Sequence, residues 1–267
     1  MKRVPETFVT GILIAVEVGV LLVVEAWSPA REPRESRVTR IARNGVLGGC
    51  ALAATGLLET PLVTRVAALA DRRGWGLLPR LRLPGLARTL VAVAALDYGI
   101  YVWHAAMHRV PALWRLHLVH HVDRDCDVST ALRIHALEIV LSVGVRVGQI
   151  VALGVRPHEF ALWQRLFGAS VIFHHANVRL PSSLDRVLGT VVMTPRRHGI
   201  HHLANRNAQH GNRSSGLTMW DRLHGTLHDG DPAGDVGVPA YRHASDVTLA
   251  KMLALPFVPQ PDPWTAR

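Results

Sequence analysis

Long apolar runs separated by short polar segments dominate the first two thirds of the chain. Five such runs are visible, at 8–27, 44–70, 86–103, 136–155 and 158–173. A helix needs about 20 apolar residues to cross a hydrocarbon core of about 30 Å, so runs of this length predict membrane spans. The pattern therefore predicts an all-α fold: a multi-pass membrane helical bundle of about four to five apolar helices.

Three of these runs carry features that shape the expected bundle. Glu59-Thr60-Pro61 interrupts the second run, and because proline kinks or ends a helix, we expect one bent span or a shallow hairpin there. The last two runs are separated by little more than Arg156-Pro157, which predicts an antiparallel helical pair. This pair returns the chain to the side it left, so the histidine-rich segments before and after it share one face.

The charge distribution bears on topology and on partners. The net charge is +10, but the basic residues are scattered between apolar runs, so we expect no nucleic-acid partner. The positive-inside rule places 28–43, with five arginines, in the cytoplasm. The segment 71–88 also carries five arginines, although simple alternation puts it on the opposite side. One early span is therefore expected not to cross fully.

Composition turns attention to histidine. The two cysteines exclude a disulfide scaffold and any Cys₄ metal site, whereas the chain holds 16 histidines, none of them before residue 104. Three clusters have helical spacing, in which positions three and four apart lie on one face. They are His104-x₃-His108, His117-x₂-His120-His121 and His198-x₂-His201-His202. The adjacent histidines diverge by roughly 100° around a helix axis, so one box can offer nitrogens to two metals.

Metal binding explains this pattern better than packing does. Buried, unsatisfied imidazoles destabilise a core, and a pH sensor does not require helical spacing. The eight imidazoles suit two metal ions with four or five ligands each, and imidazole alone does not name the metal. The sequence has no HExxH motif, which disfavours a zincin-type hydrolase, and no Glu-x-x-His pair of the soluble di-iron bundles.

Several further residues are candidates for supporting roles. His174 and His175 close the fifth apolar run, where a ninth ligand could originate, and His135 is expected to be an outer-shell or capping group. Asp97 lies two helical turns before His104, on the same face, and is expected to hold the N–H of a ligating imidazole.

Three aspartates follow the second box, and we expect at least one to pair with a histidine or with Arg133 and the others to be solvated. They are Asp123, Asp125 and Asp127. The remaining histidines are expected at interfaces or on the surface: His158, His210, His224, His228 and His243.

The combined pattern resembles the fatty acid hydroxylase and sterol desaturase superfamily. Besides the three boxes, the resemblance rests on motifs between residues 90 and 228. These are Asp97-Tyr98, Trp103-His104, His108-Arg109, Leu113-Trp114-Arg115, Ser129 to Arg133 with His135 and Glu138, His175-Ala176-Asn177, Thr194-Pro195, Trp220 to Leu223 and Gly225-Thr226. Four positions depart from the family pattern: Ala136, Gly199, His224 and Gln209-His210-Gly211.

The resemblance implies a fold, a site and a reaction. It implies N-terminal spans at 1–85, a fatty acid hydroxylase-like domain at 86–228 with a cytosol-facing, histidine-rich helical cap, and a tail at 229–267. It implies two iron ions, O₂ as co-substrate, a membrane lipid substrate and a separate electron-transfer protein, for C–H hydroxylation, desaturation or ether cleavage. The implied ligands are His104, His108, His117, His120, His121, His175, His198, His201 and His202.

The alternative is a membrane zinc-binding protein, either a transporter or a hydrolase, that uses the same clusters. A transporter would need ionisable residues along a path through its spans. The spans hold few of them, and the histidines lie at the ends of apolar runs.

Overall fold

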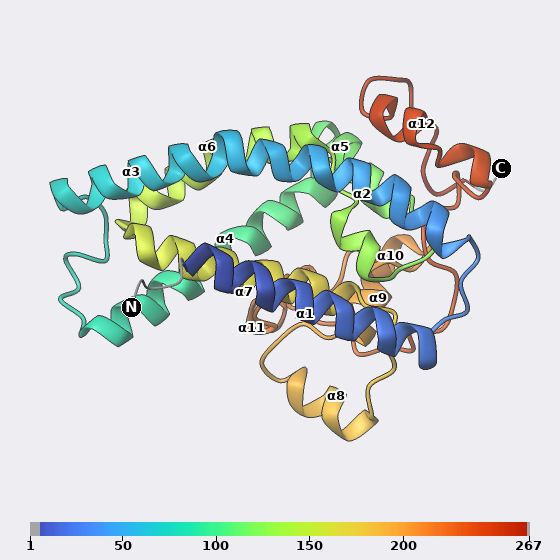
Figure 1. Ribbon diagram of the computed structural model, residues 1–267, viewed down its shortest axis with the longest axis horizontal. Helices are drawn as coiled ribbons and strands as arrows, with labels where there is room; N and C mark the ends of the chain where they lie inside the picture. Colours follow the sequence, from blue (N-terminus) through green and yellow to red (C-terminus); the bar gives the residue numbers. More distant parts are fainter. Residues whose placement is uncertain (1–5, 266–267) are drawn as a thin grey trace.

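The computed structural model describes residues 6–265, and every regular element in that range is helical. The α-helices are α1 (Glu6–Trp27), α2 (Arg37–Ala54), α3 (Thr60–Arg73), α4 (Gly85–Arg109), α5 (Pro111–His121), α6 (Ala136–Leu153), α7 (Pro157–His175), α8 (Ser182–Leu188), α9 (Pro195–His201), α10 (Arg206–Gln209), α11 (Met219–Leu223) and α12 (Leu249–Ala254). The long helices lie side by side, and the short ones α5, α9 and α10 gather toward one end of the molecule (Figure 1). The all-α prediction is confirmed.

Four helical segments in the described range are long and apolar enough to cross a membrane. They are Thr10–Trp27, Arg37–Arg73, Gly85–Arg109 and Ala136–Leu153. The fifth apolar run forms α7, which falls outside this set because polar residues such as Glu159 and Gln164 interrupt it. The chain is therefore a multi-pass helical membrane bundle, as the hydropathy pattern predicts.

The second apolar run forms one continuous span and no hairpin. A π-helical segment, Thr55–Glu59, joins α2 to α3 directly before Pro61, and the N–H of Thr60 bonds to the carbonyl of Thr55. The wider turn accommodates a proline that has no N–H to donate. The 37 residues of this span would measure about 55 Å, far more than a hydrocarbon core of about 30 Å. Its first turns, which bury Arg40 and Asn44, lie in the polar cap, the region of the protein that contains the three histidine boxes.

The helices on either side of the Arg156-Pro157 connection do not form a packed pair. Helix α6 packs mainly on α3 and α2, whereas α7 packs mainly on α4 and α9. Ile150 of α6 and Trp163 of α7 each contribute to a core that includes Leu96 of α4. Gly154 ends α6 in a left-handed conformation (φ +72°), and a Cβ there would lie 2.0 Å from the carbonyl oxygen of Trp75. The left-handed conformation of Gly154 changes the direction of the chain, so α7 packs against the bundle at a different face from α6.

Helix α1 presents apolar side chains outward and is fastened to the cap by one acid. Only 6% of its span is buried, as expected for a helix that faces lipid. Glu25 is the exception, at 1% exposure, and its carboxylate accepts the backbone N–H groups of Val128 and Asn177. One carboxylate therefore joins α1 to two loops of the cap.

All three aspartates after the second histidine box are buried, so the expectation that some are solvated is wrong, whereas the expected pairing with Arg133 is confirmed for Asp123. Arg40 donates to Asp123 and Asp127, and Asp125 accepts the backbone N–H of Arg34. Although burial opposes ionisation, the charges of Arg40 and Arg133 hold the pKa of Asp123 well below its usual range. The partners lie more than 80 positions upstream, so local sequence gives no sign of this network.

Candidate metal centre

The three histidine boxes lie where helices end and begin. His104 and His108 occupy the last turns of α4, and Pro111 starts α5 only two residues after α4 ends. Because proline needs no N–H partner in the first turn, it permits this abrupt restart. In the same way Pro195 starts α9, which carries the third box. The boxes therefore converge from separate helices.

The structure brings all nine imidazoles of the expected ligand set together, and it sorts them into two groups. The first group is His104, His108, His117, His121 and His201. The second group is His120, His175, His198 and His202. Within each group the candidate ligand nitrogens all lie within 4.8 Å of one another. Each adjacent pair of a box is split between the groups, as the divergence of neighbouring side chains on a helix requires.

In the first group, hydrogen bonds from ring Nδ1 atoms to backbone carbonyls orient the imidazoles so that the lone pairs of two Nε2 atoms face each other. Nδ1 of His104 lies 2.7 Å from the carbonyl of Arg213, and Nδ1 of His201 lies 2.8 Å from the carbonyl of Gly211. Because a carbonyl only accepts, each Nδ1 carries the proton and each Nε2 of the neutral ring carries a lone pair. The two Nε2 atoms are nevertheless 3.1 Å apart. Two lone pairs at that distance repel each other unless a cation lies between them.

The second group shows the same arrangement. Nδ1 of His175 lies 2.7 Å from the carbonyl of Val171, Nδ1 of His120 lies 3.3 Å from that of Arg133, and their Nε2 atoms are 3.1 Å apart. Two nitrogens bound to one ion at about 2.0–2.1 Å are separated by roughly 2.8–3.4 Å for angles between 90° and 109°. The observed separations fall in this range, so the residues of both groups fit a metal ion.

Burial keeps the imidazoles neutral, which is the protonation state that binds metal. It lowers the pKa of His175 to about 4. It also lowers the pKa of the other cap imidazoles well below the ordinary value: His120, His121, His198, His201 and His202. The one carboxylate bonded to a ring of either group in the described residues is Glu138, whose Oε2 lies 3.4 Å from Nδ1 of His117.

Asp97 does not hold an imidazole, contrary to the sequence expectation. Its Oδ2 accepts the indole N–H of Trp220 at 2.7 Å and the backbone N–H of Leu217 at 2.9 Å. A Cβ at Gly216 would lie 2.2 Å from its Oδ1, so the carboxylate fits closely against this loop. Asp97 therefore anchors the loop that follows Arg213, whose carbonyl holds His104.

Two histidines considered as additional ligands lie outside both groups. His174 is buried, with its ring centroid 4.0 Å from that of His198, but it is not among the nine. His135 caps α6: its Nδ1 accepts the N–H of Leu137, and its Nε2 lies 3.3 Å from the carbonyl of Leu253. The expectation of a capping role for His135 is confirmed.

Two of the departures from the expected pattern, His224 and Gly199, have local explanations. His224 is exposed and stacks against Tyr98 and Tyr101. Gly199 leaves the space that the guanidinium of Arg31 occupies, because a Cβ there would lie 2.8 Å from Nη1 of Arg31. The side chain of Arg31, which precedes α2 in the chain, therefore packs directly against Gly199 in α9.

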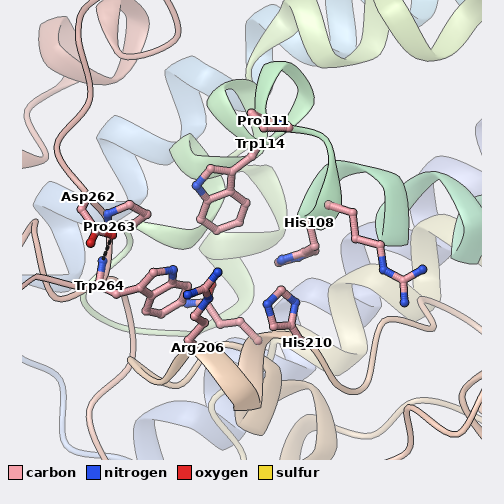
Figure 2. A pocket seen from close by; sticks show the side chains of 10 residues that line it. His108, Pro111, Trp114, Arg206, His210, Asp262, Pro263 and Trp264 are labelled. Atoms are coloured by element: carbon pink, nitrogen blue, oxygen red, sulfur yellow. Dashed lines mark hydrogen bonds between the residues drawn. The ribbon is translucent and has the colours of Figure 1, made fainter.

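A cavity of about 260 Å³ borders the first group. Its walls include the rings of His108, Trp114, His210 and Trp264 together with Arg206, which face a common space in Figure 2. The ring of Trp114 lies 5.1 Å from that of His108, centroid to centroid. His108 is also the one member of the nine that is not fully buried. The first group is therefore reachable from this cavity.

Comparisons with known proteins point to one family. The chain is 26% identical to an ornithine lipid hydroxylase of Rhizobium tropici over 66% of its own length and 50% of that protein. It is 30% identical to the human alkylglycerol monooxygenase over 51% and 29%, respectively. It is also 30% identical to a cholesterol 25-hydroxylase-like protein of Danio rerio over 54% and 59%. The chain thus spans half or less of the first two relatives.

No solved structure matches the chain. The model of the fatty acid hydroxylase family matches residues 89–226, which is more than half of the chain and contains both histidine groups. The chain therefore belongs to the fatty acid hydroxylase family.

Proposed function

We propose that this protein is a membrane-bound di-iron oxygenase that hydroxylates or desaturates a C–H bond of a lipid, with O₂ and with electrons from a separate protein. The observation that carries the proposal is that Nε2 lone pairs face one another in both histidine groups, as between His104 and His201 in the first and between His120 and His175 in the second. The names of the relatives, lipid hydroxylases and monooxygenases, support the substrate class.

The nine imidazoles would hold one iron in each group, with five ligands in the first and four in the second. An alkyl C–H bond offers no group for acid–base or nucleophilic attack, so iron would supply the activation of O₂ that this chemistry needs. The alternative of a zinc protein fits less well, because zinc has three protein ligands in typical catalytic sites and four in structural ones, whereas the first group offers five nitrogens.

The residues of the chain orient the ligands and exclude water. The carbonyls of Arg213 and Gly211 fix two rings of the first group, and the carbonyl of Val171 fixes a ring of the second. Such outer partners select the tautomer with a free Nε2. Eight of the nine rings are buried, which keeps bulk water from the centre.

We propose that the histidine groups lie on the cytoplasmic side, where a soluble reductant can reach them, and that the lipid enters from the bilayer. The exposed apolar faces of the spans, as on α1, support lateral access. We assign 86–228 as the catalytic domain, 1–85 as the N-terminal membrane spans and loops that anchor it, and 229–267 as a tail. The tail packs onto the cap, where Arg115 donates to the carbonyl of Pro256.

Isotope labelling tests this function. Cells that express the protein are grown under ¹⁸O₂, and their lipids are analysed by mass spectrometry. We expect a lipid that carries one ¹⁸O atom, or a desaturated lipid, with the wild type and with His158→Ala, an exposed histidine outside both groups. The His120→Ala variant should lose this product. An unchanged product with His120→Ala would contradict the proposal.

A further inference from the structure

The cavity beside the first group has a basic mouth without acidic partners. Arg109 and Arg206 line it and are exposed, and in the described residues neither forms a hydrogen bond or an ion pair. Asp262 is the one carboxylate in the lining. Its oxygens are already engaged, because they accept the backbone N–H of Trp264 and the hydroxyl of Thr265. The mouth therefore carries a net positive charge, with two guanidinium groups against one carboxylate.

A third arginine lies behind this mouth with unused hydrogen-bond donors. Arg213 is 2% exposed, and its Nη2 lies 3.1 Å from Nδ1 of His210, which lines the cavity. In the described residues its Nε and Nη1 have no acceptor in good hydrogen-bonding geometry, and the hydroxyl of Tyr101 offers this guanidinium only a weak one. The nearby carboxylate of Asp221 accepts the backbone N–H groups of Arg213 and Ser214. A buried guanidinium with idle donors is destabilising unless a ligand supplies an acceptor.

We propose that this cavity binds an oxyanion, a carboxylate or a phosphate, that is the headgroup of an amphiphilic substrate. The inference rests on the proposed function and extends it to a substrate class. Guanidinium groups match the planar, paired acceptors of such anions. Two of them, on Arg109 and Arg206, line the cavity, and Arg213 contacts its wall at His210. The indole rings of Trp114 and Trp264 provide apolar walls for the first carbons of the chain.

The cavity also fixes which carbon would meet the metal centre. Its volume of about 260 Å³ lies just below the usual range of about 300–1,000 Å³ for small-molecule pockets, so it holds a headgroup and a few carbons but no whole lipid. His108 belongs both to the cavity wall and to the first group. A headgroup bound by the arginines therefore places carbons near the polar end, and not the distal tail, beside the first group.

Binding measurements without turnover test the inference. The purified full-length protein, kept anaerobic and without reductant, is titrated with hexyl phosphate, hexanol and inorganic phosphate while tryptophan fluorescence is followed. We expect hexyl phosphate to bind at least about tenfold more tightly than either hexanol or inorganic phosphate. Arg206→Gln should weaken hexyl phosphate binding about tenfold, whereas Arg186→Gln, an exposed arginine on α8 outside the cavity, should not.

Three outcomes would overturn the subsite. They are equal affinity for hexyl phosphate and hexanol, equal affinity for inorganic phosphate, which would indicate a site for a free anion, and no effect of Arg206→Gln. The readout is independent of oxygen chemistry. Selective binding without any ¹⁸O product would therefore refute the proposed function alone, and ¹⁸O product without selective binding would refute the subsite alone.

Discussion

The two histidine groups share their ligand chemistry but differ in their surroundings. The first group has five imidazoles, one of which, His108, borders a cavity with a basic mouth. The second has four imidazoles, all buried, and the thiol of Cys126 donates to the carbonyl of its member His175 at 3.5 Å. Imidazole count and spacing alone would make the groups equivalent. The difference in access comes from what packs around them.

This difference suggests a division of labour within one centre. The exposed side of the first group is the place where a substrate carbon can approach, whereas the second group is enclosed by the ends of α7 and α9 and by the segment after the second box. Three pairs of variants test how far this comparison holds.

Removal of one ligand from each group should give the largest effect. We expect His201→Ala, in the first group, and His198→Ala, in the second, each to reduce the metal content from two ions to about one. Each should also lower product formation by at least about 100-fold, since loss of even an outer partner lowers metal affinity or activity 10–100-fold. Elemental mass spectrometry and the labelling assay measure these changes. If either variant kept two ions, the assignment of its histidine would be wrong.

Substitution of Arg40 should give the second-largest effect, and it should perturb the segment after the second box, which encloses the second group. Arg40→Ala leaves Asp123 and Asp127 buried without their guanidinium, so we expect a loss of about 3–5 kcal/mol in the free energy of unfolding. Denaturant unfolding in micelles measures it. Arg37→Ala, one turn earlier on α2, should change stability by less than about 0.5 kcal/mol, because Arg37 forms no ion pair in the described residues. Equal effects of the two variants would mean that the buried network contributes nothing.

Substitution of Asp97 should give the smallest effect, without loss of metal. Asp97→Asn weakens the bonds to Trp220 and Leu217 and should cost about 1–2 kcal/mol in stability, with two ions retained. Glu138→Gln is the contrasting variant. Because Glu138 bonds to His117 of the first group, loss of its carboxylate should lower metal affinity 10–100-fold. A metal titration that shows the reverse order would restore Asp97 as a partner of an imidazole.

The sequence predicts the local features of the centre well. Residues three and four apart share a helix face, so the spacing of the boxes places their histidines together, and the divergence of His120 from His121 places them in different groups. The apolar runs predict the four spans for the same reason, since length and composition are local properties.

The features that sequence reasoning missed all depend on contacts between distant segments. The carbonyl that holds His104 belongs to Arg213, 109 positions away, and backbone carbonyls have no sequence signature. Asp97 shares a helix face with His104, but its acceptor atoms meet Trp220, 123 positions away. Any helical acid at that spacing would have given the same expectation, so only the tertiary structure distinguishes the two partners.

The central proposal is that nine imidazoles hold two metal ions side by side. Anomalous diffraction at the iron edge, from crystals of the iron-loaded protein, tests it most directly. We predict two anomalous peaks per chain, one among the Nε2 atoms of His104 and His201 and the other among those of His120 and His175. A single peak, or peaks outside both groups, would contradict the claim.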